Sequence, residues 1–200
     1  MIENANSPRR RRKVDTARGL TRVARRLTTE RGLSGFTVEE VCEEVGVSRR
    51  TFFNYFPSKE SAFFGIPADR NESGVADRFL AAGPSGAGAL IDDLVDMALD
   101  RWEISGLTAA EMAMLSVAFE REPRLVGRLL ELAGEEERSD IALVVRREGW
   151  GSGDLRAGAA VQLVGALFRS SVEEFFLPDT DQDLSTILRN RLGAVRELFL

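Results

Sequence analysis

The chain has 200 residues, a formal net charge of −5, one cysteine and no histidine. A single cysteine excludes an internal disulfide, and the lack of histidine removes the usual zinc ligands and the commonest general base, so no metal, cofactor or enzymatic activity is expected. No apolar run reaches the roughly 18 residues of a membrane span, and no apolar signal segment follows the basic N-terminus, so we expect a soluble cytoplasmic protein.

Charge is distributed unevenly along the chain. Residues 1–60 contain 13 Lys and Arg against 8 Asp and Glu, whereas the remaining 140 residues contain 14 against 24. The first segment therefore favours phosphate and the second does not. Residues 1–13, which end in RRRRK, are predicted to form a disordered basic arm. Two alternatives remain open for this arm: it lies along a DNA minor groove, or it stays a solvated tail.

The first predicted helix runs from about Asp15 to Arg31, and Gly32 ends it. Its apolar stripe consists of Ala17, Leu20, Ala24 and Leu27. Its basic residues, expected on the solvated side, are Arg18, Arg22, Arg25 and Arg26. Phe36 follows as an expected core residue between this helix and the next.

Residues 37–60, TVEEVCEEVGVSRRTFFNYFPSKE, predict two short helices joined by a glycine turn, with a third helix directly after. Thr37 and Glu40 have the spacing of a capping box for the first helix, and Gly46 follows its last apolar residue. Ser48 and Ser58 are the expected caps of the second and third helices. A short helix, a tight turn and a second helix form a helix-turn-helix.

The second helix of this pair carries no acidic residue, whereas the first carries four glutamates. Such a split is expected if only the second helix meets phosphate. Phe52 and Phe56 are expected to anchor it in the core. The predicted DNA-binding residues are Thr37, Ser48, Arg49, Arg50, Thr51, Asn54, Tyr55 and Lys59. Arg49 and Arg50 are the expected base readers, because arginine pairs bidentately with guanine; Thr37, Tyr55 and Lys59 are expected at the phosphate backbone.

The stretch from Gly32 to Phe63, including GVSRRTFFNYFPSKE, resembles the DNA-binding domain of the TetR family of transcriptional regulators. The resemblance covers roughly residues 13–64 and departs from the family pattern at two positions. Phe53 stands where the family has a tyrosine, so a hydroxyl contact is lost and only an apolar contact remains. Cys42 replaces an alanine; we interpret it as a small buried residue, with a redox sensor as the alternative.

The remainder of the chain predicts helices and no strand. Residues 67–88 form a connector with a short helix near Val75 to Ala82, and longer helices follow at about 86–103, 108–121, 123–148, 154–177 and 183–199. The predicted fold is therefore all-α, with a helix-turn-helix DNA-binding domain at 14–66 and a helical ligand-binding and dimerisation domain at 67–200. The resemblance implies that the last two long helices form the dimer.

Two further sites are predicted in this second domain. The ligand pocket is expected from Leu94, Met97, Trp102, Met112, Leu115, Phe119, Leu132 and Phe168, although such residues at helical spacing also form plain core. Arg169 is the candidate anchor for an acidic ligand. The last two helices carry more apolar surface than one small core needs, so a dimer interface is predicted, with packing inside one chain as the alternative. Its residues are Leu167, Phe175, Leu188, Leu192 and Val195.

These features together predict a homodimeric transcription regulator, most simply a repressor that a small apolar or amphipathic organic molecule releases from double-stranded operator DNA. The release is expected to act through the helix that begins at Ser58, taken as the only covalent link between the domains. The alternative is a helical small-molecule binding or scaffold protein without DNA binding. A degenerate copy of the motif would be expected to lose its polar surface residues, and all of them are present.

Overall fold

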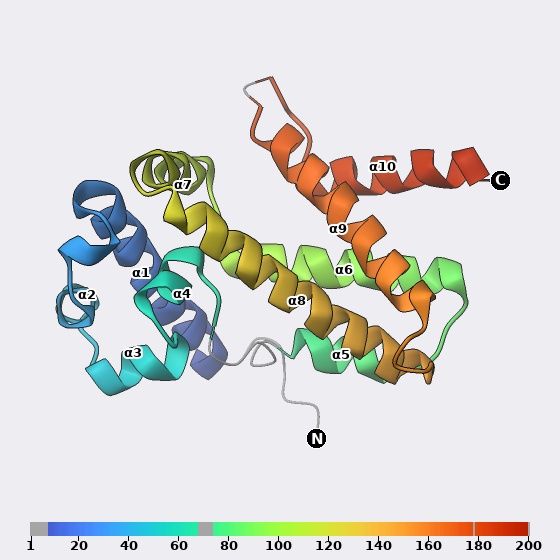
Figure 1. Ribbon diagram of the computed structural model, residues 1–200, viewed down its shortest axis with the longest axis horizontal. Coiled ribbons are helices and arrows are strands. Elements are labelled where there is room, and N and C mark those ends of the chain that lie inside the picture. Colours follow the sequence, from blue (N-terminus) through green and yellow to red (C-terminus); the bar gives the residue numbers. More distant parts are fainter. Residues whose placement is uncertain (1–7, 68–73, 178, 200) are drawn as a thin grey trace. The chain divides into compact units, whose positions relative to one another are not determined.

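The structure is a computed structural model that describes residues 8–67, 74–177 and 179–199. Within these ranges it contains helices and no strand, which confirms the predicted all-α class (Figure 1). The chain forms two compact units. The N-terminal unit comprises Met1–Glu72 and Ile104–Leu130, and the C-terminal unit comprises Ser73–Glu103 and Glu131–Leu200. The chain thus passes between the units at three points, so the expectation of a single covalent link is wrong.

The N-terminal unit begins with α1 (Pro8–Arg31), which starts earlier than predicted. Residues 8–13 are therefore helical and not part of a disordered arm, while residues 1–7 of that arm lie outside the described residues. Proline is favoured in the first turn of a helix and arginine has a high helix propensity, which accounts for the early start. The next elements are η1 (Leu33–Gly35), α2 (Val38–Val45), α3 (Arg49–Tyr55) and α4 (Lys59–Phe64).

Polar caps fix the ends of these short helices. Thr37 and Glu40 form the predicted capping box: the Thr37 hydroxyl accepts from the Glu40 N–H at 3.2 Å, and the Glu40 carboxylate accepts from the Thr37 N–H at 2.7 Å. Ser48 caps α3 by accepting the Thr51 N–H at 3.0 Å, and Ser58 caps α4 in the same way. Helices this short are unstable alone, so packing must supply the rest of their stability.

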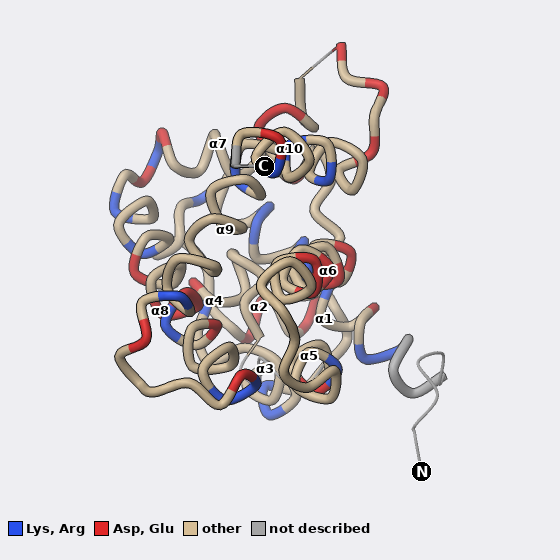
Figure 2. The backbone as a smooth tube through the Cα atoms, turned by 90° about the vertical axis from the view of Figure 1, so that its right-hand side faces the viewer, with Lys and Arg blue, Asp and Glu red and all other residues tan. Residues whose placement is uncertain are grey.

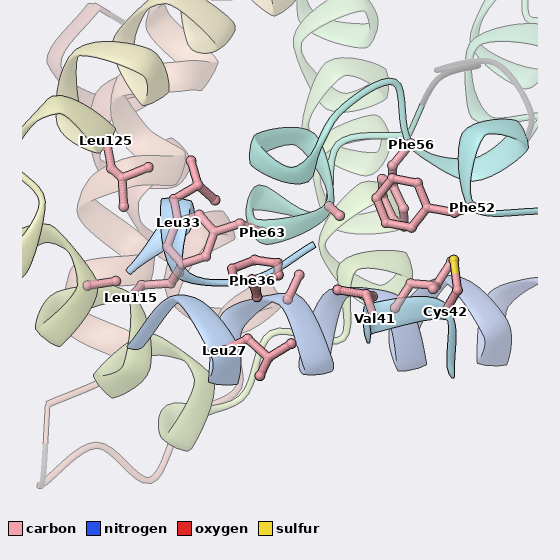
Figure 3. Packing of buried hydrophobic residues seen from close by; sticks show 14 residues of the cluster. Leu27, Leu33, Phe36, Val41, Cys42, Phe52, Phe56, Phe63, Leu115 and Leu125 are labelled. Atoms are coloured by element: carbon pink, nitrogen blue, oxygen red, sulfur yellow. The ribbon is translucent and has the colours of Figure 1, made fainter. Parts of the chain in front are cut away.

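One apolar cluster holds the N-terminal unit together (Figure 3). The predicted stripe of α1 is confirmed, because Leu20, Ala24 and Leu27 are buried and Ala17 is partly buried against the cluster. Figure 3 shows the labelled side chains following α1 from Leu115 and Leu125 at one end to Phe52 and Phe56 at the other. The buried side chains of the cluster include Leu33, Phe36, Val41, Cys42 and Phe63. Phe36 is thus the core residue that the sequence predicted.

Helix α7 (Ala109–Arg121) also packs against α1 and belongs to the N-terminal unit. Met112, Leu115 and Phe119, predicted as pocket residues, lie in or against the cluster around α1 instead. The Phe119 ring stacks on Phe64 with centroids 6.4 Å apart. The apolar face of α7 is therefore used for packing on α1 and α4. A functional boundary at 66/67 stays a prediction, and the packing of α7 runs across it.

Arg25, expected on the solvated side of α1, is buried instead, with 2% of its surface exposed. Its Nε donates to the Phe63 carbonyl at 3.0 Å, and its Nη1 lies 3.2 Å from a carboxylate oxygen of Glu111. Burial lowers the pKa of Arg25, and the charge and hydrogen bond of Glu111 act in the opposite direction. This single side chain joins α1 to the end of α4 and the start of α7.

The C-terminal unit contains α5 (Val75–Ala81), α9 (Leu155–Phe175), α10 (Leu184–Phe199) and most of α6 (Ala87–Ser105) and α8 (Arg124–Glu148). Helices α9 and α10 pack against each other and cross at an angle (Figure 1). A buried arginine, Arg147, and a half-buried one, Arg101, join the other elements. Arg147 donates to the Gly83 carbonyl at 2.7 Å and pairs with Asp93, and Arg101 binds both oxygens of Asp140 at 2.8 Å. No described helix combines the length and hydropathy of a membrane span.

Candidate DNA-binding surface and ligand cavity

The turn between α2 and α3 depends on Gly46, whose φ of 76° lies in the left-handed region. Its N–H and that of Val47 both donate to the Cys42 carbonyl, each at 2.9 Å. This pattern closes the last turn of α2 and is favoured by glycine, which has no Cβ to oppose a positive φ. The chain is thereby redirected into Ser48, the cap of α3.

Helix α3 is anchored on its inner side and polar on its outer side. Phe52 and Phe56 are 0% and 2% exposed. Arg49, Arg50, Phe53 and Asn54 are exposed. Because residues four apart lie on the same side of a helix, these four make two rows. The first row is Arg49 with Phe53, and the second row is Arg50 with Asn54.

The first row is already engaged within the protein. Arg49 Nη1 donates to a carboxylate oxygen of Glu39 at 2.7 Å, and the Arg49 guanidinium lies 5.5 Å from the centre of the Phe53 ring. Phe53 itself stays 42% exposed, although a phenylalanine gains nothing from water. If Arg49 contacts DNA as predicted, the DNA must compete with Glu39 for its guanidinium, and Phe53 is an exposed apolar side chain beside it.

The side chains of the second row, Arg50 and Asn54, have no partner within the described part of the protein. Arg50 and Asn54 make no hydrogen bond or ion pair with any other residue that the structure describes. Their donors and acceptors are therefore available to base edges, where arginine matches guanine and asparagine matches adenine. Of the two predicted base readers, Arg50 is the one that needs no rearrangement.

The predicted hydroxyl-bearing residues have structural roles as well. Ser48 Oγ and Thr51 Oγ1 lie 2.8 Å apart within the α3 cap, and the Thr37 hydroxyl belongs to the α2 capping box. Thr37 and Ser48 remain exposed, and Thr51 and Tyr55 are half-buried. Tyr55 packs against the core cluster. All four lie at the two α-helices of the motif, and their contact with DNA stays a prediction.

Lys59 makes more contacts within the protein than the sequence indicated. Its Nζ donates to the carbonyls of Leu33 and Phe36 at 2.7 and 2.6 Å and lies 4.7 Å from the centre of the Phe36 ring. An ammonium has three donors, so at most one remains for a phosphate. Lys59 therefore ties the start of α4 to η1 and the chain that follows it.

Three of the four glutamates of α2 form ion pairs with arginines, a feature that the sequence pattern did not reveal. The ion pairs are Glu39 with Arg49, Glu40 with Arg31 at 3.0 Å, and Glu44 with Arg26 at 2.5 Å. They join α2 to α1 and α3. An acidic helix can therefore stand beside a DNA-reading helix without setting up strong repulsion of phosphate.

The comparisons with known proteins agree with this geometry. A family model described as bacterial regulatory proteins, tetR family, matches residues 20–64, which run from α1 to the end of α4. The chain is 33% identical over 204 residues to the HTH-type transcriptional regulator TcmR of Streptomyces glaucescens, covering 95% of this chain and 88% of that protein. The chain belongs to the TetR family. It is a DNA-binding regulator of transcription in which α2 and α3 form the helix-turn-helix.

The C-terminal unit of this TetR-family protein contains a cavity of about 650 Å³. It is lined by α5, one side of α6, the end of α9 and the start of α10. Two predicted pocket residues, Met97 and Trp102, line it. The Trp102 ring lies 6.0 Å from the rings of both Phe168 and Phe175. Phe168 is thus in contact with a wall residue without being one itself.

The other predicted pocket residues of this unit lie elsewhere. Leu94 and Leu132 are both 3% exposed and do not line the cavity. Arg169, the candidate anchor for an acidic ligand, is exposed and does not line it either. The cavity wall carries carboxylates that sequence reasoning passed over, although the three- and four-residue spacing of the acids on α6 was a signal that they share one side.

The predicted dimer residues divide into two groups. Leu188 and Leu192 are 0% and 4% exposed, and they are buried within the single chain, where α9 and α10 pack. Phe175 contacts Phe176 and lines the cavity. Leu167 and Val195 are half-exposed and so remain available at a surface. The more buried apolar residues of α10 thus serve the chain's own core.

Proposed function

We propose that this protein is a homodimeric repressor that leaves its operator when a small organic molecule occupies the cavity of the C-terminal unit. The observation that supports operator reading best is the second row of α3. Phe52 and Phe56 fix the helix, and Arg50 and Asn54 are exposed and unengaged among the described residues. Such a helix suits the major groove, where base edges carry a distinct pattern of donors and acceptors.

Two-fold dimerisation is supported by the surface that remains after α9 and α10 have packed on each other. Ala159 and Ala166 are exposed on α9, seven residues apart and therefore on one side of the helix. Ala194 is exposed on α10, and Leu198 is 80% exposed. Small side chains let helices approach closely, and two-fold symmetry is the commonest arrangement of homo-oligomers. We propose that these residues, with Leu167 and Val195, meet their copies.

Release by a ligand is supported by the connectivity of the chain. Helix α6 lines the cavity and leads through a short turn into α7, and α7 packs on α1. A ligand that binds one arrangement of α6 better than another biases α7 to the extent of that differential affinity. In a dimer, a change that prevents both recognition helices from meeting their half-sites together costs much more than one weakened contact.

Selection of bound fragments from genomic DNA, followed by sequencing, tests the proposal. We expect a near-palindromic operator with half-sites about one DNA turn, roughly 34–36 Å, apart. Such a regulator works on the chromosome, and hence in the cytoplasm. Enrichment of no sequence, with the protein folded, would instead support the alternative of a helical binding protein without DNA binding.

A further inference from the structure

The cavity of the C-terminal unit is lined both by apolar and aromatic side chains and by acidic ones. Phe79, Met97, Trp102, Phe175 and Leu184 provide the apolar and aromatic lining. Its volume of about 650 Å³ falls in the range of sites that hold drug-sized ligands. A ring system or a branched hydrocarbon body therefore has both the room and the partners to bind here.

The walls carry more negative than positive charge. Five carboxylates line the cavity, those of Asp93, Asp96, Asp100, Glu103 and Asp183, against the two guanidinium groups of Arg78 and Arg189. Three carboxylates are thus in excess, and two remain in excess when the buried Arg147, which pairs with Asp93, is counted. Four of the five acids recur at three- or four-residue intervals on α6, where Figure 2 shows acidic positions. This surface favours a cation and opposes an anion.

In two of these acids, only one of the two carboxylate oxygens has a partner among the described residues. Asp96 Oδ1 accepts from Arg189 at 2.6 Å, and Asp100 Oδ2 accepts from Arg78. The second oxygen of each carboxylate has no hydrogen-bond or ion-pair partner among the described residues. Asp96 and Asp100 are four residues apart and hence lie one helical turn apart on the same side of α6. Trp102, which also lines the cavity, provides a ring face that attracts cations.

We propose that this cavity binds an amphipathic organic cation. Its apolar body contacts Trp102 and Phe175, and the N–H groups of its cationic part donate to Asp96 and Asp100. Among the described residues, no three or more Asp, Glu, His or Cys side chains are grouped so that they could hold a metal ion. The identification of this cation as the effector rests on the proposed function; the binding itself does not.

A pair of dyes that share a xanthene core tests the charge preference. Rhodamine 6G is cationic and fluorescein is anionic at neutral pH. In fluorescence-anisotropy titrations of the full-length protein, we expect saturable binding of rhodamine 6G and none of fluorescein. The double variant Asp96→Asn, Asp100→Asn should weaken rhodamine binding roughly tenfold or more, because two charged hydrogen-bond acceptors are lost. Trp102→Leu should weaken it as well, through loss of the ring face.

Asp92→Asn is the matched control. Asp92 lies on the same helix and pairs with Arg196 at 3.0 Å, but it does not line the cavity. This variant removes an acidic charge without touching the site, so its rhodamine affinity should stay at the wild-type value. Thermal melting followed by circular dichroism verifies that each variant is folded.

Three results overturn the proposal: no saturable binding of rhodamine 6G, equal affinity for fluorescein, or a double variant that binds like Asp92→Asn. Operator affinity, measured on the same proteins with and without dye, separates this proposal from the proposed function. If the dye binds at the cavity and operator affinity stays unchanged, the proposed release by a ligand is contradicted. The proposed cation site is then still supported. Operator binding by a protein that takes no cation contradicts the cation site alone.

Discussion

Arg49 and Arg50 are neighbours of the same type, yet they stand in different surroundings. Arg50 is unengaged within the described residues, whereas Arg49 is held by Glu39 and covers Phe53. We expect Arg50→Ala to weaken operator binding by about 1–3 kcal/mol and to relax specificity at one base pair. Anisotropy titrations against operator variants measure both effects. Unchanged affinity across all variants would remove Arg50 from the contact surface.

Glu39 gives a second prediction at this scale, because it competes with DNA for Arg49. Glu39→Gln should strengthen operator binding, since it frees the guanidinium and removes a negative charge near phosphate. Glu43→Gln is the control, because Glu43 is exposed on the same helix and has no partner among the described residues. Any gain from charge removal alone appears in both variants. Equal gains in both would show that the Glu39–Arg49 pair does not restrain DNA binding.

Lys59 yields a third prediction, because it serves the fold as well as the surface. Lys59→Met removes the donor to the Leu33 and Phe36 carbonyls and should cost about 1–3 kcal/mol of unfolding free energy. Urea unfolding followed by circular dichroism measures this loss. Arg50→Ala is the comparison, since it should weaken DNA binding without altering stability. A Lys59→Met protein of wild-type stability would contradict the structural role.

The sequence was sufficient to predict which residues α3 exposes but not how they pair. Helical spacing separates Phe52 and Phe56 from their polar neighbours, so the exposed row could be predicted from local sequence alone. The Glu39–Arg49 pair joins two helices whose relative placement is set by the turn and the core. Periodicity within one helix contains no information about such a partner.

At the scale of the element, α7 also shows that a sequence pattern does not identify the neighbour against which a helix packs. Its ends were predicted to within about one residue, and Thr108 and Glu111 form a capping box at its start. Its apolar face was assigned to a pocket, yet it packs on α1. A hydrophobic pattern indicates that a face is buried and not which neighbour buries it. For the same reason Leu188 and Leu192 were assigned to a dimer and lie in the chain's own core.

The buried pair of Arg25 and Glu111 gives a prediction for α7. Glu111→Ala should destabilise the N-terminal unit by about 3–5 kcal/mol, because it leaves the Arg25 charge buried without its partner. Glu120→Ala, at an exposed position of the same helix, should change stability little. Urea unfolding of both variants measures the difference. Equal stability of the two proteins would show that the pair does not hold α7 in place.

At the scale of the whole molecule, the proposed dimer predicts different effects for a charge placed on the exposed surface of α9 and a charge placed in the core of α10. Ala166→Glu places a charge on an exposed strip and should give a folded monomer that has lost most of its operator affinity. Leu188→Glu places a charge in a fully buried position and should prevent folding. Light scattering after gel filtration, together with circular dichroism, distinguishes these outcomes. A monomeric Ala166→Glu protein with wild-type operator affinity would contradict the requirement for a dimer.

Cys42 has a practical consequence for the molecule as a whole. It is the only thiol in the chain, it is 5% exposed, and it lies in the cluster beneath the recognition helix. Burial, and next the nearby Glu39, raise its pKa, so little thiolate forms at neutral pH. A thiol reagent can therefore reach it only when this domain opens. The rate at which Cys42 is labelled should therefore report how often the domain opens. This rate should fall when bound operator DNA stabilises the closed domain.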